Sequence, residues 1–196
     1  DIASIYESNR AEVLWHPDEI AAFTNGAPAH IARILMAATE TGLRPGDLAT
    51  LRKEHIHPTP NGKRIVLWTA KGKRHRRMAS IPVTPRMDEI IEAAKGDYII
   101  TNMRGQPYKH GNYLGDAVSE WRDKIGLRRD LRLYDARGTA ATRLLAAGAD
   151  LKEIATHMGW SIKHASEVIE HYVALSPDMT DGLAAKLARI ERGTKL

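Results

Sequence analysis

Two arginines stand at the predicted starts of helices, where a cation is unusual. Arg44 lies in TGLRPGDL, between Gly42, which can end one helix, and Pro45, which suits the first position of the next. Arg137 lies in LYDARGTAATRL, in the first turn of a helix that Asp135 can cap. A positive charge at the positive end of a helix dipole is unfavourable unless an anion offsets it. Both positions therefore predict an anion-binding role, with a phosphate as the natural ligand.

A tryptophan and a tyrosine follow on the next two predicted helices. Asp150 and Glu153 form a capping-box pattern that opens the first of these helices, and Gly159–Trp160 closes it. Ser161 can cap the second helix, where Tyr172 falls at helical spacing with the apolar positions. Tyr172 is therefore expected on the inward face, with a hydroxyl that needs a partner. Taken singly, both aromatic residues are more often core anchors than chemical groups.

Composition narrows the classes of function. The chain of 196 residues is long enough for one sizeable core, has no cysteine and has no run of 18 apolar residues. Disulfides, thiolate metal sites and a cysteine nucleophile are excluded, and the nine histidines show no repeated metal-ligand spacing. We therefore expect neither a metal site nor a membrane span.

Basic residues gather in one segment of the chain. The net charge is +5, and no acidic residue occurs between Asn61 and Met87. The residues of this segment that we expect at a nucleic-acid interface are Lys63, Arg64, Lys71, Lys73, Arg74, Arg76 and Arg77. The alternative is a solvated face, which is the usual reason for a run of like charges.

The spacing of apolar residues predicts a mainly helical α+β domain. An Asn-Gly turn at 61–62 joins strands at 55–58 and 64–68, and a third strand covers 79–83, so that 71–77 is the loop between the second and third strands. Helices are predicted at 17–25, 28–42, 111–125, 136–147, 150–159, 161–172 and 178–192, with two more starting at 45 and 84. Residues 1–15 carry no clear core stripe and are expected to be a linker or the remnant of a missing N-terminal domain. The main domain is then 16–176, and 177–196 is a C-terminal helical segment.

Five of these residues form a set in chain order: Arg44, Lys71, Arg137, Trp160 and Tyr172. The set resembles the catalytic domain of the tyrosine recombinases, the phage integrase family. The resemblance implies a mainly helical α+β fold with a small three-stranded antiparallel sheet. It also implies an enzyme that cleaves and rejoins DNA at specific sites through a 3′ phosphotyrosyl intermediate, without a cofactor. In the implied roles both arginines bind the phosphate, Lys71 protonates the leaving oxygen and Tyr172 attacks, while Trp160 fills a position that is His or Trp elsewhere.

The sequence departs from the family pattern beside the second arginine. Tyr134 stands three residues before Arg137, where the family usually has His, and Gly138 stands where another His is common. Tyr134 can still hydrogen-bond a phosphate, but it cannot accept a proton near neutral pH as imidazole does. His157 is a candidate for part of this general-base role, unless it points elsewhere.

Two other residues have supporting roles in this interpretation. Asp47 follows Arg44 by three residues and can orient its guanidinium or serve as an ordinary first-turn acid. Lys73 is the fallback for Lys71 because the basic loop is longer than in many members of the family. Without the resemblance, ion pairs with Asp47 and Asp135 would be the simpler explanation of both arginines.

The resemblance covers about residues 11–176 and implies double-stranded DNA as the partner. It implies a homotetramer on that DNA, and a monomer in solution is compatible with it; the helix at 178–192 is then expected to pack on a neighbouring protomer. We expect the protein to act in the cytoplasm, on the nucleoid of a prokaryotic or phage-infected cell. Two other functions stay open, a DNA-binding protein that has kept the fold and lost the chemistry, and a type IB topoisomerase.

Overall fold

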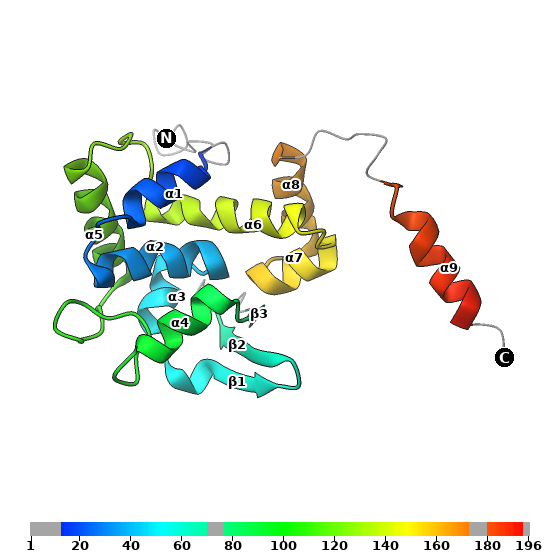
Figure 1. The fold of residues 1–196 in the computed structure, drawn as a ribbon, viewed down its shortest axis with the longest axis horizontal. Coiled ribbons are helices and arrows are strands. Elements are labelled where there is room, and N and C mark those ends of the chain that lie inside the picture. The colour runs from blue at the N-terminus through cyan, green and yellow to red at the C-terminus, as the bar shows by residue number, and fades with distance from the viewer. Residues whose placement is uncertain (1–12, 70–76, 173–179, 194–196) are drawn as a thin grey trace, which may run out of the picture.

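The computed structural model describes residues 13–69, 77–172 and 180–193, and it has the mainly helical α+β fold that the sequence predicts (Figure 1). Its α-helices are α1 (Pro17–Thr24), α2 (Ala29–Thr41), α3 (Pro45–Thr50), α4 (Pro85–Ala93), α5 (Gly111–Lys124), α6 (Ala136–Ala146), α7 (Leu151–Met158), α8 (Ile162–Tyr172) and α9 (Leu183–Gly193). Short 3-10 helices are η2 (Lys53–His55) and η3 (Leu133–Asp135), and the strands are β1 (Ile56–Thr59), β2 (Gly62–Trp68) and β3 (Met78–Pro82).

Helix α2 organises the larger part of the core. Its apolar residues recur at helical spacing, and Ile34 and Leu35 are completely buried. The helix packs against α1, α4, α5 and α6, which surround it (Figure 1). It ends at Gly42, which adopts the left-handed conformation expected of a helix C-cap. The end of α2 is thus fixed among several elements.

The three strands form one antiparallel sheet in the order β1-β2-β3. Side chains alternate along each strand, so Ile65 and Leu67 of β2 and Ala79 and Ile81 of β3 are buried on one face. Helix α7 packs against β3. The predicted hairpin and third strand are confirmed to within one or two residues at each end, and the sheet is joined to the helices that follow Arg137.

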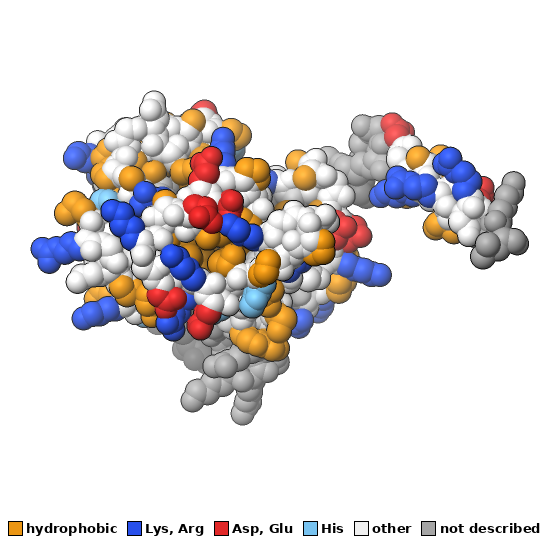
Figure 2. All heavy atoms as spheres, turned by 60° about the horizontal axis from the view of Figure 1, so that its bottom comes forward, with side chains coloured by type: hydrophobic (Ala, Val, Ile, Leu, Met, Phe, Trp, Pro, Cys, Tyr) orange, Lys and Arg blue, Asp and Glu red, His pale blue; other side chains and the backbone are white. Residues whose placement is uncertain are grey.

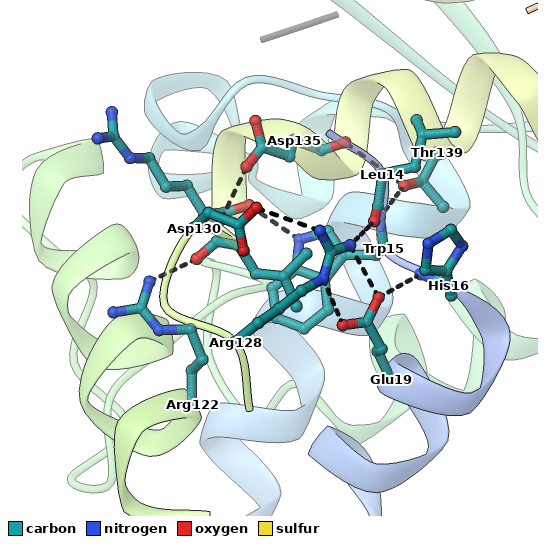
Figure 3. A network of polar contacts seen from close by, with 11 residues as sticks. Leu14, Trp15, His16, Glu19, Arg122, Arg128, Asp130, Asp135 and Thr139 are labelled. Carbon is teal, nitrogen blue, oxygen red and sulfur yellow. Dashed lines mark hydrogen bonds and ion pairs between the residues drawn. The ribbon is translucent and has the colours of Figure 1, made fainter. Parts of the chain in front are cut away.

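The start of the folded domain differs from the prediction. Trp15, which we assigned to a linker, is 2 % exposed, packs edge-on against Phe23 and donates from Nε1 to the carbonyl oxygen of Arg132. Arg128 binds the Leu14 carbonyl and both carboxylate oxygens of Glu19 (Figure 3). Val13, Leu14 and Trp15 form an apolar run too short to give a periodic signal, so only the tertiary partners of Trp15 reveal it as core.

The C-terminal helices form a second apolar cluster. Ile154, Ala155, Met158 and Ala165 are buried between α6, α7 and α8. The predicted Asp150–Glu153 capping box is present, and Ser161 accepts from the His164 amide as a cap. Each of these helix starts follows from local sequence alone.

Helix α9 stands clear of the rest of the described chain, with hydrophobic and basic side chains on its surface (Figures 1 and 2). It begins at Leu183, later than the predicted 178. Its apolar residues Leu183, Leu187 and Ile190 are all exposed. Among the residues described, no helix has the length and apolar character needed to cross a membrane.

Candidate nucleic-acid cleavage site

Arg137 is held by the ends of two other helices. Its side chain is 5 % exposed, and Nη1 donates to the Gly42 carbonyl oxygen at 2.7 Å while Nη2 donates to the Met158 carbonyl oxygen at 3.5 Å. The last carbonyls of a helix have no partner within the helix, so they attract a cation. Arg137 therefore joins the end of α2 to the end of α7.

Asp135 does not cap α6 as predicted. It occupies the N-cap position, but its backbone is helical and its Oδ2 accepts from the Arg132 amide at 2.8 Å, closing η3 (Figure 3). Because η3 leads directly into α6, the residue before α6 lacks the extended backbone that a side-chain N-cap requires. Arg137 nevertheless lies in the first turn of α6, as the sequence predicts.

Arg44 lies beside Arg137. It is the N-cap residue of α3, two residues after the Gly42 carbonyl that Arg137 binds. Burial, together with the nearby charge of Arg44, lowers the pKa of Arg137 to about 10. Arg137 remains charged at neutral pH. The Nη1 atom of Arg44 is buried and has no hydrogen-bond partner in the described part of the chain.

Two oxygen-bearing side chains accompany the arginine pair. Asp47 is 1 % exposed in the first turn of α3, and Tyr134 is 52 % exposed in η3. The charges of Tyr134 and Asp47 both raise the pKa of Arg137, against the larger effect of burial. The predicted site residue Tyr134 and the predicted supporting residue Asp47 thus both lie near Arg137, Asp47 buried and Tyr134 open to solvent.

Trp160 covers the Arg137 guanidinium. The guanidinium carbon lies 5.5 Å from the centre of a Trp160 ring, and His164 packs edge-on against the tryptophan at 4.9 Å. Gly159 precedes it with φ of +65° and ends α7. This left-handed turn directs the chain so that the half-buried indole lies against the cation.

The base of the basic loop lies against the same turn. Thr69 and Arg77, which flank the loop, are joined by hydrogen bonds from the Thr69 amide and hydroxyl to the Arg77 carbonyl. A methyl group on Gly159 would lie 3.1 Å from Thr69 Cγ2 and 3.9 Å from Arg77 Cβ. Lys71, Lys73, Arg74 and Arg76 lie outside the described residues. The strands that carry this loop are therefore adjacent to Gly159 and Trp160.

Tyr172 is the last residue of α8, and its side chain is not among the described parts. Its helix packs against both α6 and α7, the helices that carry Arg137 and lead to Trp160. The prediction that the Tyr172 side chain faces inward therefore remains a prediction.

His157 supports the backbone near Arg44. It is 7 % exposed, and its Nε2 lies 2.9 Å from the Thr41 carbonyl oxygen, so Nε2 carries the proton and donates. Burial lowers the pKa of His157, and the Thr41 bond opposes this shift. Nε2 is therefore not available as the general base that we considered. Its partner is a backbone carbonyl, for which side-chain patterns give no signal.

Two predicted DNA contacts have protein partners. Lys63 Nζ lies 2.7 Å from Asp88 and 2.6 Å from Glu92, and these hydrogen bonds raise its pKa. Arg64 donates to the Ser80 hydroxyl across the sheet at 2.9 Å. Lys63 thus belongs to an ion-pair cluster with α4, whereas Arg77 is exposed at the foot of the loop.

Comparison with known proteins agrees with this geometry. The model of the phage integrase family matches residues 15–178. The integrase of Mycobacterium phage FRAT1 is 26 % identical over 166 residues, which cover 73 % of this chain and 49 % of the relative. The tyrosine recombinase XerD of Lacticaseibacillus casei is 24 % identical over 147 residues, covering 67 % of this chain and 46 % of the relative. The chain thus spans about half the length of the curated relatives it matches.

Solved structures share the fold. The catalytic core of lambda integrase superposes with a TM-score of 0.62 at 18 % identity, covering 74 % of this chain and 90 % of that one. A lambda integrase dimer bound to a COC′ core site gives a TM-score of 0.63 at 19 % identity, covering 79 % and 47 %. With the family match over most of its length, and with the two arginines side by side, the chain belongs to the phage integrase family.

Proposed function

We propose that this chain is the catalytic domain of a site-specific recombinase or integrase that cleaves and rejoins double-stranded DNA. The observation that supports this function best is the paired placement of Arg44 and Arg137. Two guanidiniums that repel each other, one with a buried Nη1 lacking a hydrogen-bond partner among the described residues, favour a bound anion between them. A DNA phosphodiester supplies that anion.

In the proposed reaction the oxygen of Tyr172 attacks the scissile phosphorus. The bond from phosphorus to the 5′ oxygen breaks, a 3′ phosphotyrosyl ester forms, and Lys71, or Lys73 in its place, gives a proton to the leaving oxygen. A 5′ hydroxyl then attacks the ester, which restores a phosphodiester and the tyrosine. Because each step exchanges one phosphate ester for another, no nucleotide or metal cofactor is required.

The other site residues act on the phosphate and its surroundings. Arg44 and Arg137 bind the non-bridging oxygens and stabilise the charge that develops there. Asp47 and Tyr134 set the local charge around the pair, and Trp160 keeps the Arg137 guanidinium in place. His157 acts through the backbone of Thr41. The proposed DNA contacts outside this centre are Arg64, Lys73, Arg74, Arg76 and Arg77; Lys63 is left out because two carboxylates already bind it.

Assembly on DNA is part of the proposal. The exposed apolar residues Leu183, Leu187 and Ile190 of α9 fit a helix that packs on a neighbouring protomer in a tetramer around two DNA segments. Residues 177–196 then link protomers, and the domain that begins with the buried Trp15 performs the chemistry. In this proposal the protein acts on the nucleoid, in the cytoplasm of a prokaryotic or phage-infected cell.

The decisive experiment looks for the covalent intermediate. The purified chain is incubated with a pool of nicked duplexes of random sequence, and DNA that stays attached after denaturation is sequenced. We expect an adduct through a 3′ phosphate that Tyr172→Phe abolishes and Tyr113→Phe, at an exposed tyrosine of α5, retains. An adduct that survives Tyr172→Phe would refute the assignment of the nucleophile.

The second candidate is a DNA-binding protein of the same fold without cleavage activity. Tyr134 in place of the usual His, exposed to solvent, favours it because no imidazole is available there as a base. Salt-sensitive DNA binding with no adduct on any duplex would support this alternative. Relaxation of supercoiled DNA without a preferred site would instead support the type IB topoisomerase function.

A further inference from the structure

The first residue of α5, Gly111, has no room for a side chain. A methyl group there would lie 2.5 Å from the Gly46 amide nitrogen, 2.7 Å from the Pro45 carbonyl carbon and 2.8 Å from the Gly46 Cα. Carbon atoms in favourable contact are about 3.5–4.0 Å apart. All three neighbours are backbone atoms, which cannot rotate away as a flexible side chain does. The start of α5 therefore lies directly against the start of α3.

The backbone that Gly111 touches comes immediately after Arg44. Helix α3 has only six residues, and Arg44 is its N-cap, so the direction of the Arg44 side chain depends on where this helix begins. From the other side, His157 binds the Thr41 carbonyl and Arg137 binds the Gly42 carbonyl. Residues 41–46 are thus held at both ends, by α6 and α7 before Arg44 and by α5 after it.

The helices α3 and α5 have no freedom to separate without loss of core packing. Leu48 of α3 and Leu114 of α5 are both completely buried. The two helices are in extensive contact. A side chain at Gly111 must therefore displace Pro45 and Gly46 rather than shift α5 outward as a whole.

We propose that Gly111 is a positioning residue for the phosphate site: its lack of a side chain sets the start of α3 and thereby the place of Arg44 relative to Arg137. This inference rests on the proposed function for its catalytic consequence. Its structural part, the displacement of Arg44, stands independently of that function.

The chain offers two matched controls. Gly115 lies one turn further along the same helix, and a methyl group there meets nothing within 4 Å. Gly46 lies in α3 beside Arg44, and a methyl group there also meets nothing within 4 Å. Gly115→Ala tests the gain in helix propensity alone, and Gly46→Ala tests an added methyl on α3 itself.

The experiment compares Gly111→Ala with these controls in adduct formation on trapped duplex at saturating DNA. We expect Gly111→Ala to slow adduct formation by about 10- to 100-fold with little change in DNA affinity, because misplacing a group that binds the reacting phosphate costs rate. Gly115→Ala and Gly46→Ala should keep the rate of the unchanged chain. Equal rates for all three variants would overturn the inference.

A second measurement keeps the structural part testable on its own. Crystal structures of Gly115→Ala and of the double variant Gly111→Ala/Gly115→Ala, in which the added helix propensity supports folding, would be compared at Arg44. We expect displaced Pro45 and Gly46 backbone only in the double variant, and an unmoved Arg44 there would overturn the proposal. If the unchanged chain forms no adduct while this displacement is seen, the proposed function fails and the positioning role of Gly111 holds.

Discussion

Arg137 donates a hydrogen bond from Nη1 to the carbonyl oxygen of Gly42, 2.7 Å away and 95 residues earlier in the chain. Gly42 ends α2, and Arg44 follows it by two residues. The two arginines are therefore not placed independently, since the backbone that leads to one is bound by the side chain of the other. Any change that moves the Gly42 turn is therefore expected to move both Arg44 and Arg137, the two arginines of the proposed phosphate site.

Gly42→Ala should destabilise the protein more than a change at an uncrowded glycine. Gly42 has φ of +69°, and a methyl group there would lie 2.6 Å from Met158 Sδ and 3.2 Å from Ala140 Cβ. The backbone strain costs about 1–3 kcal/mol, and the crowding adds to it. We expect a lower free energy of unfolding in urea.

Gly26→Ala is the matched control for this change. Gly26 has φ of +83° and meets nothing within 4 Å, so its substitution carries the strain without the crowding. Equal losses of stability for Gly42→Ala and Gly26→Ala would show that contact with Met158 and Ala140 is unimportant.

The salt dependence of DNA binding separates the basic residues that are available to phosphate from those that are not. Arg77 is exposed at the foot of the loop, whereas Lys63 is bound by Asp88 and Glu92. Each phosphate neutralised contributes about 0.9 to the slope of log affinity against log salt. Arg77→Gln should reduce the slope by roughly that amount, and Lys63→Gln should leave it unchanged, as measured by fluorescence anisotropy at several salt concentrations. A larger effect from Lys63→Gln would reverse this assignment.

What could be predicted from sequence was whatever local chemistry decides. The Asp150–Glu153 box and the Ser161 cap each depend on a few neighbouring residues, and both are present. The hairpin turn lies one residue earlier than the predicted Asn61–Gly62, at Pro60 and Asn61, because Gly62 already pairs with Thr59 in the sheet. The helix-start positions of Arg44 and Arg137 were found in the same way.

The differences from prediction arise where a distant partner decides. Trp15 is core because it packs against Phe23 and donates to the Arg132 carbonyl, which lies 117 residues later in the chain. Lys63 is bound by two carboxylates of α4, and His157 binds a backbone carbonyl of α2. No spacing rule within one segment contains these partners, because they are brought together only by packing.

Trp160 should be replaceable by His but not by Ala. Its ring lies 5.5 Å from the Arg137 guanidinium and packs against His164. Removing the ring exposes the guanidinium and loses a cation–π contact of about 0.5–2 kcal/mol, so Trp160→Ala should slow adduct formation. His can fill the same position and donate to a phosphate, so Trp160→His should retain more activity in the same assay. A rate for Trp160→His as low as that for Trp160→Ala would contradict this role.

His157 makes stability depend on pH in a predictable direction. Burial lowers its pKa below the ordinary 6.5, so the folded protein binds the proton less readily than the unfolded chain. Above pH 6.5 the histidine is neutral in both states and contributes no pH dependence. As the pH falls from 6.5 toward the lowered pKa, protonation favours the unfolded chain, and the free energy of unfolding should decrease.

The variant His157→Gln tests this contribution. Its amide can still donate to the Thr41 carbonyl but does not titrate, so its stability at pH 7.5 should stay close to that of the unchanged chain, and part of the loss below pH 6.5 should disappear. His157→Leu leaves the carbonyl without that donor and should lose about 1–3 kcal/mol at pH 7.5. Its deficit relative to the unchanged chain should be smaller at pH 5.5, because leucine does not titrate. His57→Gln, at an exposed histidine of β1, serves as the control. Urea titrations at pH 7.5 and pH 5.5 measure all three, and an undiminished pH dependence in His157→Gln would mean that other groups produce it.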